Sequence, residues 1–268
     1  MRHPRLGVLV AMVVLGAVGS TACSRAQSPG APPTTPTAAP TSAFAGESSE
    51  QIMQRALDAF RAAHTVHVRG QRTDYGNTTT LIDLSVDIDR AAAIEILRPD
   101  GHTVEIRRLA DKVYIKADPD YWKQTVAAEP TVWNASPDRV AAILKDKYLV
   151  AVPQMVSSGA DKTPAMLNQE IIYATQAFGA FLDGPTTRGD RTTFNGTTVV
   201  TIRNLNRDSA ASLNAETLYL TATATPLPLR IEGPRGFLDF QDFGAPVTVT
   251  APPASQIVDI ATLRAASR

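Results

Sequence analysis

The chain has 268 residues, of which 44% are hydrophobic and 6% aromatic, and its 26 basic residues are matched by 26 acidic ones. This balance argues against nucleic acid as a partner, because binding to phosphates needs a basic field. A single cysteine excludes an internal disulfide. The residues from 48 onward are numerous enough to bury one substantial core, so we expect a single domain over residues 48–268.

Residues 1–22 have the order of a secretory signal peptide. Arg2 and Arg5 precede an apolar run over residues 6–18, and small residues follow. The run is shorter than the roughly 20 residues that a membrane-spanning helix needs. Cys23 follows directly, as in bacterial lipoprotein signals, so we expect it to be the lipid attachment site, with a diacylglycerol and palmitate anchor. The alternative is an ordinary secretory signal with a cysteine near its cleavage site.

Residues 23–47 combine the expected lipidated cysteine with a stretch rich in Ser, Thr, Pro and Ala. Such a composition cannot bury enough apolar surface to offset the entropy of ordering, which predicts a disordered tether. We therefore expect an exported protein whose domain is held at the outer face of the cell membrane by a lipid anchor.

A helix and a first group of strands are expected next. Ser48 and Gln51 have the spacing of a capping box, and apolar residues then recur at helical intervals as far as Ala63. Residues 82–89 alternate between apolar and polar side chains, which is typical of a half-buried strand. Further apolar strand positions are Val66, Val68, Ile94, Ile96, Val104, Ile106, Val113 and Ile115.

Two helices are expected in the middle of the chain. One begins at Ser136, before Pro137, and continues to Leu149. The other begins at Thr163, before Pro164, and ends before Gly184. Its apolar stripe is formed by Leu167, Ile171, Ala174, Phe178, Phe181 and Leu182.

Residues 217–250 contain the longest alternating pattern of the chain and predict a second antiparallel meander. Leu218 and Leu220 lie on its apolar face, and the alternation continues to Val247 and Val249. A tight hairpin at Asn195 and the following glycine leads towards this meander.

Two segments of this meander carry a family resemblance. TATATPLPLRIE at residues 221–232 and LDFQDFGAPVTVTAPPASQIVD at residues 238–259 resemble the end of the actinobacterial lipoproteins of the LppX/LprA/LprF/LprG group. The match covers about one fifth of the chain. The resemblance implies a LolA-like fold of class α+β, in which a large curved antiparallel sheet forms a half-barrel with helices packed on its concave face.

A curved sheet whose helices do not fill its concavity would leave an apolar cavity suited to acyl chains. The resemblance to lipid-carrying lipoproteins favours such a cavity, and it implies a protein that binds or transports a lipid, glycolipid or lipidated molecule. The alternative is an interaction or sensor module with a filled core that docks a protein of the cell envelope. The residues expected to line the cavity are Ile82, Leu84, Val86, Ile94, Ile96, Val104, Ile106, Leu167, Ile171, Ala174, Phe178, Phe181, Leu218 and Leu220.

The motifs of catalysis are missing from the sequence. His64, His67 and His102 have no metal-ligand spacing, and we expect them to be solvated. No G-x-S-x-G elbow occurs, and Asp87 and Asp89 lack the rest of a calcium loop. We expect neither an enzyme nor a cofactor or metal site.

Overall fold

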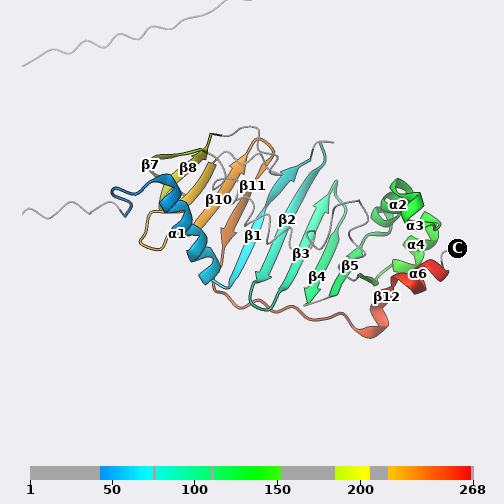
Figure 1. The fold of residues 1–268 in the computed structure, drawn as a ribbon. Coiled ribbons are helices and arrows are strands. Elements are labelled where there is room, and N and C mark those ends of the chain that lie inside the picture. Colours follow the sequence, from blue (N-terminus) through cyan, green and yellow to red (C-terminus); the bar gives the residue numbers. More distant parts are fainter. Residues whose placement is uncertain (1–42, 75–76, 110–111, 152–184, 206–216, 267–268) are drawn as a thin grey trace, which may run out of the picture. The chain divides into compact units, whose positions relative to one another are not determined.

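The computed structural model describes residues 43–74, 77–109, 112–151, 185–205 and 217–266. The described strands form one twelve-stranded sheet, and the class is α+β. Its strand order is β12-β6-β5-β4-β3-β2-β1-β11-β10-β9-β8-β7 (Figure 1). Neighbouring strands are antiparallel except β12 and β6, which are parallel.

The strands of the first half are β1 (Thr65–Thr73), β2 (Thr79–Asp87), β3 (Ala92–Pro99), β4 (Val104–Leu109), β5 (Lys112–Ala117) and β6 (Tyr148–Ala151). Those of the second half are β7 (Thr186–Phe194), β8 (Thr197–Asn204), β9 (Thr217–Thr221), β10 (Pro228–Gly233), β11 (Gly236–Gln241) and β12 (Ile257–Asp259). Asn195 and Gly196 join β7 to β8 with φ angles of 48° and 78°, as a tight hairpin turn requires.

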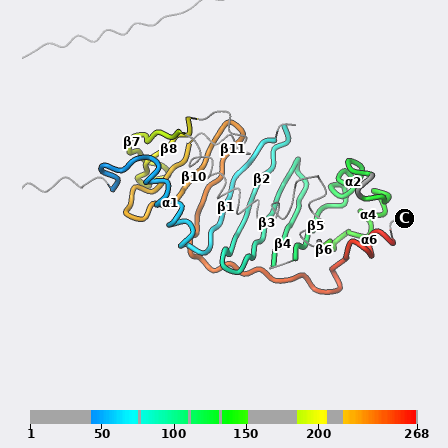
Figure 2. The backbone as a smooth tube through the Cα atoms, in the orientation of Figure 1, coloured from blue at the N-terminus to red at the C-terminus, as the bar shows by residue number. Residues whose placement is uncertain are grey.

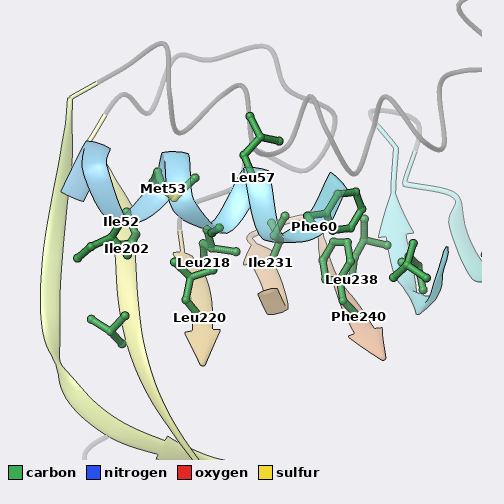
Figure 3. Close-up of a cluster of buried hydrophobic side chains, with 14 of the residues drawn as sticks. Ile52, Met53, Leu57, Phe60, Ile202, Leu218, Leu220, Ile231, Leu238 and Phe240 are labelled. Atoms are coloured by element: carbon green, nitrogen blue, oxygen red, sulfur yellow. The ribbon is translucent and has the colours of Figure 1, made fainter. Parts of the chain in front are cut away.

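Helix α1 (Ser49–Ala62) begins with the expected capping box. The Gln51 backbone N–H donates to Ser48 Oγ at 3.3 Å, and the Ser48 backbone N–H donates to Gln51 Oε1 at 2.9 Å. Its apolar stripe, including Ile52, Met53 and Phe60, packs onto β8–β11 (Figure 3). Phe44 is 2% exposed in the same cluster, so the chain joins this core ahead of the helix.

A second group of helices packs against the other end of the strand order. It consists of α2 (Pro119–Ala128), α3 (Pro130–Trp133), α4 (Pro137–Leu144) and α6 (Ile260–Ala266), and η2 (Ala254–Gln256) precedes β12. Trp122, Val126, Leu144 and Leu263 are buried there with Val104 of β4. Trp122 and Trp133 pack edge to face inside this cluster, with their ring centres 6.1 Å apart.

The sheet has one face that both clusters cover. Val68 pairs with Leu84 in the first cluster, and Ile82 lies on the same face of β2 as Leu84. Ile82 pairs with Leu97 of β3, which pairs with Val104 in the second cluster. We call this the inner face and the opposite one the outer face. Both helical groups are therefore on one side of the sheet.

The end of the helix that begins at Pro137 differs from the sequence prediction. The helix from Pro137 ends at Leu144, and Tyr148 and Leu149 belong to strand β6 instead. Asp146 has a φ of 59°, which breaks the helix before the strand starts.

The strand expected at Val247 and Val249 is absent too, because residues 242–256 form a linker outside the sheet. Figure 2 shows this linker running from the end of β11 to β12. Pro246, Pro252 and Pro253 cannot donate ladder hydrogen bonds, which accounts for the extended linker.

Candidate functional site

An uninterrupted apolar row crosses the inner face from β8 to β5. Its members are cross-strand partners, and paired residues lie on the same face. The row consists of Ile202, Leu218, Ile231, Leu238, Gly70, Ile82, Leu97, Val104 and Ala117.

The two ends of this row are covered by helices and its middle is only partly covered. Leu218 is fully buried in the first cluster, and Val104 is 3% exposed in the second. Between them Ile82 and Leu97 pair across β2 and β3 and are only half-buried. Ile82 packs against the first cluster and Leu97 against the second. The central inner face, which we define by these two residues with Ile106 and Ile115, is therefore apolar.

A charged pair interrupts the neighbouring row. Glu95 lies between Leu84 and Ile106 in register and is 3% exposed. Arg108 occupies the next inner-face position of β4, diagonal to Glu95 and opposite Ala93. Diagonal positions are about 7–8 Å apart, which long side chains can bridge. A carboxylate and a guanidinium thus lie within reach of one another beside an apolar surface, where opposite charges reduce the cost of burial.

Several predicted lining residues share this face. Leu84, Val86, Leu218 and Leu220 are buried in the cluster under α1, where Figure 3 labels Leu218 and Leu220. Ile82, Val104 and Ile106 extend across the centre and into the second cluster. The first four therefore pack as core beneath the helix, Ile82 and Ile106 belong to the central inner face, and Val104 is buried in the second cluster.

The prediction for Ile94 and Ile96 is wrong. Register pairs Ile94 with Ser85 and Ile96 with Asp83, so both isoleucines are on the outer face, opposite to Ile82. The inner positions of β3 are Ala93, Glu95 and Leu97 instead. Alternation within one strand shows which residues share a face, but only pairing with neighbouring strands shows which face it is.

Six predicted residues lie outside the described residues. They are the lipid attachment residue Cys23 and the lining candidates Leu167, Ile171, Ala174, Phe178 and Phe181.

The predicted set of lining residues leaves out four residues of the inner face near its centre, namely Leu97, Ile115, Glu95 and Arg108. Leu97 and Ile115 are apolar and continue strands that the sequence did predict, so their alternation could have identified them. Glu95 and Arg108 are charged, and charge alone predicts an exposed position. No local signal distinguishes them from outward-facing residues.

The outer face contains a histidine that the sequence predicted to be solvated. His67 is instead only 16% exposed in its side chain, and its Nε2 lies 2.7 Å from Asp83 Oδ1. Burial raises the pKa of Asp83, but the hydrogen bond and charge of His67 and the charge of Arg69 outweigh it and hold this pKa below its ordinary value. The arrangement links β1 to β2.

The described part of the chain contains no group of three or more His, Cys, Asp or Glu side chains that could hold a metal ion. Among its helices, none has the length and apolar character needed to cross a membrane.

No protein-family model matches the chain, and no curated protein matches it. Among solved structures, an uncharacterised conserved protein from Thermus thermophilus is similar, with 10% sequence identity and a TM-score of 0.38. The alignment covers 78% of this chain and 99% of that one. A likeness at this level carries no argument about function.

Proposed function

We propose that the protein is an exported lipoprotein, anchored through Cys23 at the outer face of the cell membrane, whose LolA-like domain binds a lipid or lipidated molecule. Its role is to hold this ligand or hand it over, without catalysis. The observation that supports the proposal best is the apolar row, which continues between the two clusters where Ile82 and Leu97 are only half-buried.

The size of the apolar row suits an acyl chain. The partly buried stretch is the central inner face, which crosses β2 to β5 from Ile82 to Ile115, and at the usual strand spacing this is about 14 Å. A chain lying along it would gain roughly 0.8 kcal/mol for each buried methylene. Arg108, which is half-buried in the neighbouring row, would face the polar part of such a ligand.

The first experiment is mass spectrometry of the protein purified from membranes. Organic extraction is expected to release acyl lipids in proportion to the protein. The intact mass is expected to show the loss of residues 1–22 and an acylated Cys23. A clean extract from folded protein would contradict the lipid role and leave the interaction or sensor module as the remaining candidate.

A matched pair of substitutions tests the location of the ligand. Leu97→Trp fills space on the central inner face and is expected to lower lipid occupancy severalfold. Ile96→Trp places the same bulk one residue away, on the outer face, and should leave occupancy unchanged. Circular dichroism melting identifies any variant that fails to fold, and Ile106→Phe provides a milder inner-face change. Equal occupancy in Leu97→Trp and Ile96→Trp would contradict this location.

A further inference from the structure

A polar groove lies on the outer face, beside the turn that joins the end of strand β10 to the start of strand β11. Its volume is about 390 Å³. The groove is lined by Gln71, Thr73, Thr217, Glu232 and Phe237 together with the turn residues Gly233, Pro234, Arg235 and Gly236. The lipid-binding proposal uses none of these residues.

Most of these side chains belong to one cross-strand row. Gln71 pairs with Phe237, Phe237 with Glu232, and Glu232 with Thr217. Since partners across a sheet share a face, an amide, an aromatic ring, a carboxylate and a hydroxyl follow one another in line. The strands thus present hydrogen-bonding groups at regular intervals with a ring among them.

The carboxylate and the ring are each held by a second contact. Tyr219 Oη donates to Glu232 Oε1 at 2.6 Å, which fixes the direction of the carboxylate. The Arg230 guanidinium lies 4.2 Å from the centre of the Phe237 ring, and it donates to both carboxylate oxygens of Asp239 at 2.6 and 2.7 Å. A site whose side chains are already oriented loses less entropy when a ligand binds.

The backbone around the groove is also constrained. A Cβ at Gly236 would collide with the carbonyl oxygen of Gln71, and the φ of Gly236 is +139°. The Thr73 backbone N–H donates to the Arg235 carbonyl at 2.7 Å, which ties the turn to β1. The groove is therefore built on paired strands and a tied turn.

The chemistry of the lining selects a class of ligand. Glu232 and Arg235 carry opposite charges, so the groove has no excess of positive charge for an anion. Together the amide, carboxylate and hydroxyl groups can both donate to and accept from alcohols, and an aromatic ring offers an apolar plate for a C–H surface. We propose that this groove binds a neutral saccharide of one or two sugar rings. Its volume is within the usual range for small-ligand sites.

Saturation-transfer NMR on the purified mature protein tests the proposal. The probes are maltose, cellobiose, lactose, mannobiose and arabinobiose. At least one is expected to receive saturation and to bind with a measurable Kd. Gln71→Leu removes the amide at nearly constant volume and should weaken that binding about tenfold or more, and Glu232→Gln should weaken it as well.

Ser85→Ala serves as the control, because Ser85 is on the outer face of β2 and outside the groove. It should leave the Kd unchanged. The proposal is overturned if no probe receives saturation, or if binding persists unchanged in both groove variants. Lipid occupancy of the Gln71→Leu protein should match that of the wild type, so the saccharide and lipid proposals can fail separately.

Discussion

His67 connects three segments of the outer face. Its Nε2 lies 2.7 Å from Asp83 of β2, and its Nδ1 lies 3.4 Å from Asp242 at the start of the linker. Arg69 Nε lies 3.2 Å from the second oxygen of Asp83. The Asp83 carboxylate on β2 thus contacts both His67 and Arg69, which are neighbours on the outer face of β1.

Asp83 should make the stability of the fold depend on pH. Its pKa in the folded protein is lowered, so it stabilises the fold above the unfolded value of about 3.9, and this contribution is lost as pH falls through the folded pKa. Asp83→Asn should lower the free energy of unfolding at pH 5 by about 0.5 kcal/mol, since the pair is partly exposed. The difference from wild type should shrink towards pH 3 in urea titrations.

Asp100→Asn is the control for this titration, because Asp100 lies in an exposed turn. At pH 5, Asp83→Asn should lower the free energy of unfolding more than Asp100→Asn does. A gap between Asp83→Asn and wild type that widens towards pH 3 would contradict the assignment.

At the scale of elements, the pairing of β1 with β11 leaves no room for a side chain at Gly70. Gly70 of β1 pairs with Leu238 of β11, and a Cβ at Gly70 would collide with the carbonyl oxygen of Phe237. Gly70 also belongs to the apolar row of the inner face. This contact joins the two meanders, since β1 begins the first and β11 ends the second.

Gly70→Ala should therefore destabilise the fold by about 1–3 kcal/mol, because the added methyl group forces the backbones of β1 and β11 apart. Chemical denaturation measures the effect. Gln71→Ala, at the adjacent position on the outer face, removes side-chain atoms without a clash and should cost less. A Gly70→Ala protein as stable as wild type would show that the strands can separate freely at this point.

At the scale of the whole domain, two hydrophobic clusters share one face of the sheet. The first lies between α1 and strands β1, β2 and β8–β11, and the second among α2, α4, α6 and strands β4–β6 and β12. The second is completed by the end of the chain, where Val258 is 6% and Leu263 1% exposed. The linker over residues 242–256 carries this end across from β11.

Removal of residues 254–268 should therefore weaken the second cluster selectively. Losing the burial of Val258 and Leu263 should cost about 3 kcal/mol or more, because each side chain contributes roughly 1.5–3 kcal/mol. Hydrogen exchange should accelerate roughly a hundredfold in α2, α4 and β6 while α1 keeps its protection. Equal acceleration around both clusters would indicate one cooperative unit instead.

Local patterns of the sequence were sufficient for several elements. The capping box of α1 is an interaction between Ser48 and Gln51, three residues apart, and the hairpin at Asn195 depends on two adjacent residues. The alternation of apolar and polar residues in β2 also indicates its two faces, because residues two apart in a strand point to the same face. Interactions between residues this close in the chain can be predicted from the sequence alone.

The tertiary structure alone decided which strands meet and which face of β3 turns inward. Glu95 is buried on the inner face, with Arg108 half-buried on the same side, because β3 pairs with β2 and β4 in a register that places Leu84 and Ile106 beside Glu95. The same register puts Ile94 and Ile96 outside, and the pairing of β1, β11, β10 and β9 aligns Gln71, Phe237, Glu232 and Thr217 along the groove. These positions follow from contacts between residues far apart in the chain, which no local pattern contains.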